Sequence, residues 1–289
     1  MTDPAASRTD AWLRRALADG VVTLDPSFQG LPETAHGGSV LALFDAIAGL
    51  DGMRTLRGTY HRRVPLAAPL SLAIDRDAAA ARLRLSEGAT LLVDGVVTAS
   101  DGAGAAADTS AAPADTSAAL ALPISRTCFA CGIDNPLGLR AALVLDEAHV
   151  RTRWIPRKQL RDSANPAMEE GTLATVALTT LLDEAAFWLG AAASGESGMT
   201  TTLRVDLLRA VPFGEAVTVA GSRAGVAPRA DDPRYWDTEV AAWDDAGRLI
   251  ARANITFVAV RGAARKLVTG LLAMNPPDTL RRVFPAYVR

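Results

Sequence analysis

Three consecutive residues, His36-Gly37-Gly38, stand directly before an apolar run with helical spacing. Backbone N–H groups at the start of a helix have no partner within the helix, and together with the helix dipole they favour negative charge. Glycine at this point lets a substrate carbonyl approach the backbone closely, and His36 could orient the turn or the substrate. The three residues therefore predict either an oxyanion-binding helix start or a plain tight turn that leads into a helix.

Carboxylates that could act as nucleophile or base lie inside two apolar segments. Asp45 lies in residues 36–50, and Asp183 lies beside Glu184 in residues 171–190. Burying a carboxylate is costly unless it is satisfied, so an acid inside an apolar helix suggests a function. The alternative for Asp183 is a structural role, as a cap for a neighbouring turn or as the partner of a buried arginine. Glu184 competes with Asp183 for the carboxylate role.

Two cysteines, Cys128 and Cys131, form a single C-x-x-C pair. Structural zinc sites need four ligands, but there is no second cysteine pair, and neither His61 nor His149 has metal-site spacing to this one. A redox pair would need a βαβ setting that the sequence does not show. We therefore expect a structural turn here, and no metal site.

The two apolar segments belong to two halves of the chain that read alike. Residues 36–50 have apolar residues at helical spacing and residues 171–190 are apolar on most sides, which predicts two buried helices. A β-branched run with a Val-Pro corner, at Pro65 and at Pro212, follows each helix, and more strands come after it. One buried helix followed by antiparallel strands is an α+β unit, with the helix packed on one face of the sheet. The alternative, two unrelated α+β domains, does not explain the shared order.

A stretch of small residues divides the two halves. Residues 101–122 are rich in alanine, serine and aspartate, and ADTSAA occurs in them twice. Such residues bury little surface, so we expect a flexible linker between an N-terminal domain (residues 1–100) and a C-terminal domain with an extension (residues 123–289). The length of 289 residues also favours two domains.

Composition narrows the class of protein and its compartment. The formal net charge is −2, which gives no attraction to nucleic acid or to acidic membranes. No unbroken apolar run approaches the ~18 residues of a membrane span. The first residues carry acids where a signal peptide needs basic and then apolar residues, and two cysteines are too few for a disulfide scaffold. We therefore expect a cytoplasmic protein.

Three motifs resemble those of hot-dog-fold acyl-CoA thioesterases. Residues 28–46 resemble the F-x-G-x-P-x-x-x-H-G-G…D signature, and residues 128–139 resemble the C-x-x-C-G-x-x-N-P-x-G-L opening of many bacterial members. Residues 181–188 and 200–212 resemble the family's helix-to-strand segment. The resemblance implies an α+β fold in which a curved antiparallel sheet wraps a long helix, normally used as a dimer with sites at the interface. With both halves on one chain, we expect a tandem (double) hot-dog fold, with two buried antiparallel helices under one continuous sheet.

The resemblance also implies how the two halves share a site. The family's catalytic Asp follows its His by nine positions, as Asp45 follows His36. Nine helical residues span ~13 Å, too far for one thioester carbon to touch both ends. In a two-fold pair of antiparallel helices, however, the start of one helix lies beside the middle of the other. We therefore expect His36, Gly37 and Gly38 to meet the second half's aspartate, Asp183.

The partner strand residues point to one complete site and one degenerate site. The family's polar strand residue corresponds to Thr200 in the second half and to Met53 in the first. The complete site would combine the His-Gly-Gly element with Asp183 and Thr200. In the degenerate site, Asp45 would face residues 174–176, which read Ala-Thr-Val.

These expectations make the chain an acyl-CoA thioesterase, with a coenzyme A or carrier-protein thioester as its partner. No cofactor is expected beyond coenzyme A as part of the substrate, whose phosphates could contact Arg62, Arg63 and Arg209. No nucleic acid or membrane partner is expected, and a homo-oligomer is left open. One alternative is a non-catalytic acyl-CoA-binding protein. Another is a hydratase or dehydratase on the same fold, which would need a His–Asp or His–Glu acid/base pair in a different motif that the sequence does not show.

Overall fold

The protein is described from a computed structural model, which covers residues 20–100, 111–113, 119–162 and 171–288. The elements, in chain order, are β1 (Val21–Thr23), η1 (Pro26–Phe28), α2 (Gly37–Ala48), β2 (Arg54–Tyr60), β3 (Pro69–Arg76), β4 (Ala80–Glu87), β5 (Thr90–Ala99), β6 (Leu120–Ala121), β7 (Val144–Leu145), β8 (His149–Trp154), η2 (Lys158–Leu160), β9 (Arg161–Asp162), β10 (Thr172–Leu173), α3 (Thr175–Ser194), β11 (Gly198–Leu207), β12 (Val217–Ser222), β13 (Ala227–Pro228), β14 (Tyr235–Trp243), β15 (Leu249–Ala259), α4 (Ala263–Leu271) and α5 (Pro277–Val283).

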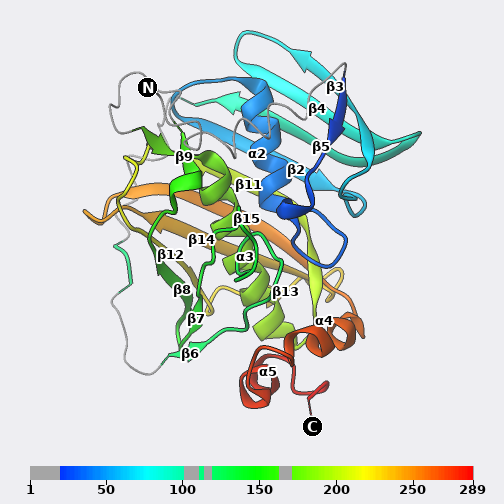
Figure 1. The fold of residues 1–289 in the computed structure, drawn as a ribbon, viewed down its shortest axis with the longest axis vertical. Helices are drawn as coiled ribbons and strands as arrows, with labels where there is room; N and C mark the ends of the chain where they lie inside the picture. Colours follow the sequence, from blue (N-terminus) through cyan, green and yellow to red (C-terminus); the bar gives the residue numbers. More distant parts are fainter. Residues whose placement is uncertain (1–19, 101–110, 114–118, 163–170, 289) are drawn as a thin grey trace.

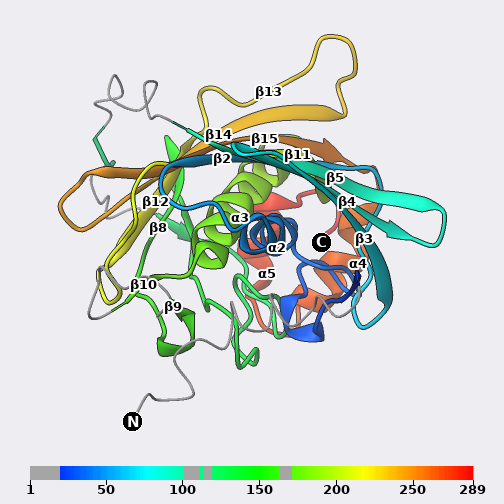
Figure 2. The same ribbon diagram turned by 90° about the horizontal axis from the view of Figure 1, so that it is seen from above.

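One large antiparallel sheet carries most of the strands. Its order is β1-β3-β4-β5-β2-β11-β15-β14-β12-β8-β7-β6, and β13 pairs with β14. Seen from above, the sheet curves over α2 and α3, which lie side by side beneath it (Figure 2). The prediction of one continuous antiparallel sheet over two buried helices is therefore correct at the level of architecture.

The sheet contains the same five-strand pattern twice. The order β1-β3-β4-β5-β2 in the first half matches β8-β12-β14-β15-β11 in the second, and each half has its short 3-10 helix and its long helix in the same places. The two patterns meet where β2 pairs antiparallel with β11 at the middle of the sheet. Figure 1 shows this junction between the blue and cyan strands of the first half and the yellow and orange strands of the second.

The Val-Pro corners explain where each helix starts. The amide of Ala35 donates to the carbonyl of Val64 at 2.8 Å, and the amide of Leu173 donates to that of Val211 at the same distance. Beside each bond, the proline of the corner forms an isolated β-bridge with the segment that enters the helix. The corner thus fastens the chain just before α2 and just before α3.

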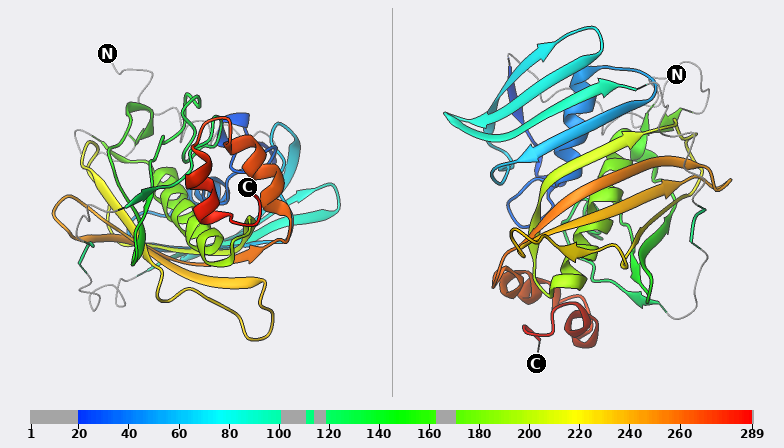
Figure 3. Two further views of the ribbon diagram at one scale, coloured as in Figure 1. Left: turned by 90° about the horizontal axis from the view of Figure 1, so that it is seen from below. Right: turned by 180° about the vertical axis from the view of Figure 1, so that it is seen from behind.

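The long helices are antiparallel. Thr179 Oγ1, early in α3, donates to the carbonyl of Gly38 at the start of α2 at 2.8 Å. Asp45, late in α2, is bridged by Arg54 to Thr175 in the first turn of α3. The start of α2 therefore lies beside the interior of α3, and the later part of α2 lies beside the start of α3. The two helices must run in opposite directions. The view from behind shows the sheet crossing in front of both helices (Figure 3).

Helix α3 runs through the core. It is long and apolar enough to cross a membrane by length and composition, but 83% of its most apolar window is buried inside the molecule. Core helices meet the same test, so this feature reflects burial under the sheet. At its C-terminal end, α4 and α5 cover the helix (Figure 3), where the Trp188 and Phe284 rings lie 6.3 Å apart.

The predicted linker, residues 101–122, lies mostly outside the described residues. Its last two strand-forming residues, Leu120 and Ala121, make up β6, which pairs with β7. Leu122 is buried in the core. The second half of the fold therefore begins before residue 123, inside the predicted linker.

Candidate active site

The start of α2 points at the middle of α3. His36 is the N-cap residue of α2, with extended backbone (φ −66°, ψ 132°), and it is buried. The amide of Gly38 donates to Asp183 Oδ2 at 2.9 Å and lies 3.2 Å from His36 Nδ1. An unpaired first-turn amide of one helix therefore meets a carboxylate from the other helix, where the dipole favours negative charge.

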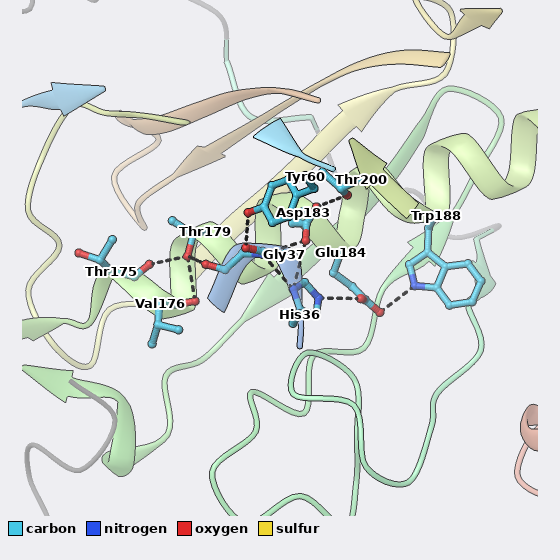
Figure 4. Close-up of polar contacts among 11 residues, drawn as sticks. His36, Gly37, Tyr60, Thr175, Val176, Thr179, Asp183, Glu184, Trp188 and Thr200 are labelled. Carbon is cyan, nitrogen blue, oxygen red and sulfur yellow. Dashed lines mark hydrogen bonds and ion pairs between the residues drawn. The ribbon is translucent and has the colours of Figure 1, made fainter. Parts of the chain in front are cut away.

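Asp183 collects three donors, two from the start of α2 and one from strand β11 (Figure 4). Besides the Gly38 amide from α2, His36 Nδ1 lies 3.1 Å from Oδ2. From strand β11, Thr200 Oγ1 donates to Oδ1 at 2.6 Å. These contacts satisfy the charge of a carboxylate that is only 4% exposed, and they fix its orientation. The structure thus brings together His36, Gly38, Asp183 and Thr200, which the sequence placed in one site.

Glu184 holds the other side of the His36 ring. Glu184 Oε2 lies 3.3 Å from His36 Nε2, and its Oε1 accepts a 3.0 Å hydrogen bond from Trp188 Nε1, one turn further along α3. Burial would lower the pKa of His36, but the hydrogen bonds to Asp183 and Glu184 outweigh it and raise that pKa well above its usual value. His36 therefore bridges two buried acids from adjacent positions of α3.

Gly37 and Gly38 have different surroundings. Gly38 is pressed against the backbone of Thr179 and Thr180, so that an added Cβ would overlap it, and its amide is already engaged by Asp183. Gly37 lines the pocket, and within the described residues no acceptor engages its amide. The hydroxyl of Tyr60 donates to the Gly37 carbonyl at 2.6 Å. Of the two glycines, Gly37 therefore has the amide that can face an oxyanion.

A pocket of about 830 Å³, including its mouth, opens at these residues. Its polar floor is formed by His36, Gly37, Asp183, Glu184 and Thr200. The remaining lining is largely apolar or lies near the mouth: Leu31, Phe187, Trp188, Met199, Leu267 and Leu271, with Arg62 and Arg63, which are exposed. A polar floor next to apolar walls and two guanidinium groups suits a ligand with a reactive polar centre, an apolar arm and an anionic part.

The second half-site has a different character. Asp45 is paired with Arg54, whose Nε and Nη2 donate to its two oxygens at 2.6 and 2.7 Å. Met53 and Arg209 line the same separate pocket, so Arg209 lies away from Arg62 and Arg63. Asp45 is therefore neutralised by Arg54, and the second half-site holds an ion pair at the contact between the two helices.

Cys128 and Cys131 lie in the wall of the first pocket, close to its polar floor. Cys128 Sγ, a His36 ring nitrogen and a Glu184 oxygen all lie within 4.8 Å of one another. A hydrogen bond from Cys131 lowers the pKa of the Cys128 thiol, and the same bond raises the pKa of the Cys131 thiol. The turn is therefore part of the site, which the sequence interpretation as a separate structural turn did not include.

The sequence interpretation predicted only part of the contacts of His36. It expected His36 to meet Asp183, but it did not predict that His36 contacts Asp183 and Glu184 together, and it found no acid/base pair of the hydratase kind. Glu184 is 148 positions away along the chain, and no motif spacing links it to His36. Tyr60, Trp188 and Leu271 were missed for the same reason. An apolar segment near the C-terminus was the only signal for the wall that α4 supplies.

Comparisons with known proteins identify the fold to which the chain is similar. No family model matches the chain, and a search of curated proteins finds no match. Among solved structures, the acyl-CoA thioesterase II TesB2 of Mycobacterium marinum matches with a TM-score of 0.56 at 14% identity, covering 86% of this chain and 96% of that one. The tesB protein of Mycobacterium avium subs paratuberculosis matches with a TM-score of 0.58 at 13% identity, covering 83% and 92%.

Two further structures mark the breadth of the fold. A conserved protein of unknown function with hot dog fold from Alicyclobacillus acidocaldarius has a TM-score of 0.57 at 13% identity, covering 86% of this chain and 98% of that one. The dehydratase domain of the CurJ module of Curacin polyketide synthase reaches 0.50 at 8% identity, covering 81% and 86%. At these identities the similarity concerns the fold, which proteins with different chemistries share. This chain has the hot-dog fold of the thioesterase II proteins.

Proposed function

We propose that the chain is a tandem (double) hot-dog thioesterase that hydrolyses acyl-CoA thioesters at one site between its two halves. The repeated five-strand order supports the tandem arrangement, since each repeat carries one long helix. The observation that carries the function is the contact of Asp183 with Gly38, His36 and Thr200 in one pocket. Only this half-site has a carboxylate without an arginine partner among the described residues.

In the proposed reaction the thioester carbonyl lies against the Gly37 amide, at the start of α2. The developing negative charge then meets an N–H group and the positive end of a helix dipole. In one route Asp183 takes the proton of the attacking water, the fatty acid forms, and the departing thiolate of coenzyme A receives that proton. In the other route Asp183 attacks the carbonyl carbon and expels the thiolate, which takes a proton from solvent, and water then hydrolyses the acyl–Asp183 anhydride to the acid and the free carboxylate. Thr200 and the Gly38 amide hold the carboxylate in place for this step.

The rest of the pocket fits the rest of the substrate. The acyl chain would lie along Phe187, Leu267 and Leu271, which are apolar and partly or fully buried. The phosphates of coenzyme A would meet Arg62 and Arg63 at the mouth, because guanidinium groups pair well with phosphate. Arg209 is removed from this role by its place in the other pocket.

One observation favours a second candidate, a hydratase or dehydratase that acts on acyl thioesters. His36 lies between Asp183 and Glu184, and such a pair could move a proton at the acyl chain. The two reactions differ in products. Hydrolysis releases a free thiol, whereas dehydration of a 3-hydroxyacyl thioester forms a double bond and leaves the thioester intact.

A single experiment separates the candidates. The purified chain is incubated with saturated, 3-hydroxy and 2-enoyl acyl-CoA thioesters, while free thiol and enoyl absorbance are followed together. Thiol release that depends on Asp183 supports the thioesterase. Enoyl formation or loss without thiol release supports the second candidate. Tight acyl-CoA binding without either reaction would overturn the proposal and favour a non-catalytic acyl-CoA-binding protein.

A further inference from the structure

We propose that His36, Cys128 and Glu184 form a binding site for a divalent transition-metal ion of the zinc class in the wall of the pocket. The three side chains come from the start of α2, from the loop after β6 and from the middle of α3. Their ligand atoms lie within 4.8 Å of one another, and all three residues are buried. Imidazole, thiolate and carboxylate are the groups that bind Zn²⁺ in proteins. The inference does not depend on the proposed hydrolysis.

The distances are those of a nearly formed site. With zinc–ligand bonds of ~2.0–2.3 Å, neighbouring ligand atoms of a tetrahedral site lie ~3.3–3.8 Å apart. His36 Nε2 and Glu184 Oε2 are 3.3 Å apart. Because the ligand atoms of the three residues all lie within 4.8 Å of one another, the Cys128 sulfur would need to move by at most about one ångström to complete the triangle. Three protein ligands leave a fourth coordination position for water or a ligand.

Two of the three ligands, His36 and Glu184, also have an outer partner that orients them. Asp183 Oδ2 lies 3.1 Å from His36 Nδ1, so an N–H at Nδ1 can point to the carboxylate while Nε2 turns toward the ion. Trp188 Nε1 donates to Glu184 Oε1, which leaves Oε2 for the metal. Cys131 lies beside Cys128 in one buried cluster. Outer partners of this kind are typical of the histidine and carboxylate ligands of metal sites.

The turn that carries Cys128 is held rigidly. The Gly132 amide donates to the Cys128 carbonyl at 2.9 Å, and a Cβ at Gly132 would overlap the Cys128 backbone. Phe129 is fully buried, its amide donates to Gln29 at 2.6 Å, and its ring lies 5.0 Å from that of Phe28. The C-x-x-C-G turn is thus fastened to the loop that leads into α2, and it presents Cys128 to His36.

The balance of charge allows such an ion. Asp183 and Glu184 are adjacent buried acids, and among the ion pairs of the described residues His36 is the one basic side chain that contacts them. Buried charges are normally paired or bound to a metal. A divalent ion that replaces the Nε2 and Cys128 thiol protons would leave the net charge of the cluster unchanged, and those two protons would be released to solvent.

The test uses the full chain without an affinity tag, kept under reductant, and its readout is metal binding. Zinc content is measured by plasma mass spectrometry after expression in zinc-supplemented medium. Chelator-treated protein is then titrated with Co²⁺, whose bond to a thiolate gives an ultraviolet charge-transfer band. We expect one equivalent of either ion and a saturable band. Less than a tenth of an equivalent, with no band at excess Co²⁺, overturns the site.

Matched variants assign the ligands. Cys128→Ser should abolish the charge-transfer band, and Glu184→Gln should weaken binding but keep the band. Cys131→Ser is the control, because Cys131 is not one of the three proposed ligands. Its charge-transfer band should persist at saturating Co²⁺, and its affinity for the ion should be lower by at most about 10–100-fold. Circular dichroism and thermal melting establish that each variant is folded. A band that survives Cys128→Ser and disappears in Cys131→Ser overturns the proposed ligand set. Because binding is measured without substrate, a chain that binds the ion but hydrolyses nothing, or the reverse, separates this inference from the proposed function.

Discussion

The amide of Gly38, in the first turn of α2, donates a 2.9 Å hydrogen bond to the carboxylate of Asp183, in the middle of α3. The two residues are 145 positions apart in the chain. They meet because the helices are antiparallel and because Gly38 has no side chain to hold the α3 backbone away. The position of the proposed catalytic carboxylate therefore depends on the packing of the two helices.

Asp183→Asn should reduce kcat/KM by about 10²–10⁴-fold, because an amide is neither nucleophile nor base. The size of the side chain is kept, and Thr200 and Gly38 can still contact it, so acyl-CoA binding should change little. Steady-state kinetics and equilibrium binding measure the two effects separately.

Asp45→Asn is the matched control for Asp183→Asn, since the two aspartates occupy corresponding positions in α2 and α3. Turnover should stay near that of the wild type. Loss of the ion pair with Arg54 should lower the free energy of unfolding, which thermal melting measures. The loss should be smaller than the about 3–5 kcal/mol of a fully buried pair, because Arg54 is partly exposed. Equal loss of activity in both variants would argue for two working sites.

Alanine at the two glycines should separate stability from activity. At Gly38 the new methyl group would overlap the Thr179 backbone, so Gly38→Ala should destabilise the fold by at least about 1–3 kcal/mol. At Gly37 it would lie 2.8 Å from Asp183 Oδ2, a side-chain atom that can shift only by weakening its hydrogen bonds. Gly37→Ala should therefore destabilise the fold less than Gly38→Ala but lose about 10²-fold in kcat, because the carboxylate is displaced. The reverse pattern would contradict the roles given to the two glycines.

Much of the architecture could be predicted because it depends on local sequence patterns. The apolar runs predicted helices near residues 37–50 and 172–190, and the structure has Gly37–Ala48 and Thr175–Ser194. The sequence Asp244-Asp245-Ala246-Gly247, which is typical of a hairpin turn, lies between β14 and β15, where Gly247 has the positive φ of 73° that such a turn needs. Periodicity and turn chemistry act over a few residues, so the sequence shows them directly.

The site could be predicted only in part. The meeting of His36 with Asp183 follows from the motif spacing and the antiparallel helices, but the contacts with Glu184 and Cys128 do not. Those contacts depend on which face of α3 turns toward the pocket and on where the C-x-x-C turn is fastened. Both are results of tertiary packing, as is the Arg54 partner of Asp45, for which the sequence has no local signal.

Removal of the Thr200 hydroxyl tests how Asp183 is held. The hydroxyl donates a 2.6 Å bond to Oδ1, and a hydrogen bond to a charged group contributes about 1.5–3 kcal/mol. Thr200→Val keeps the shape but lacks the donor, so kcat should fall by about 10–100-fold with little change in KM. Thr200→Ser restores the hydroxyl and should restore most of kcat. A serine variant as slow as the valine variant would show that the methyl group, not the hydroxyl, matters.

Asp206 links the two halves at the β2–β11 junction, and the stability of the fold should depend on its charge. It accepts hydrogen bonds from Thr55 on β2 at 2.6 Å, from Arg204 at 3.1 Å and from Arg252 on β15 at 3.3 Å. Burial would raise the pKa of Asp206, but these bonds outweigh it and hold the pKa below its usual value. The stabilisation is therefore present above the unfolded-state pKa of ~3.9, and it is lost as the pH falls through the lower folded-state pKa.

Urea unfolding across the acid range, with Asp206→Asn beside the wild type, measures this contribution. At neutral pH the variant should be less stable by about 1–2 kcal/mol, since Arg204 and Arg252 are partly solvent-screened. The difference should shrink below about pH 4, where the wild-type carboxylate also becomes protonated. A difference in unfolding free energy that stays constant down to the lowest pH at which the protein folds would show that Thr55 and the two arginines do not hold the halves together through the charge of Asp206.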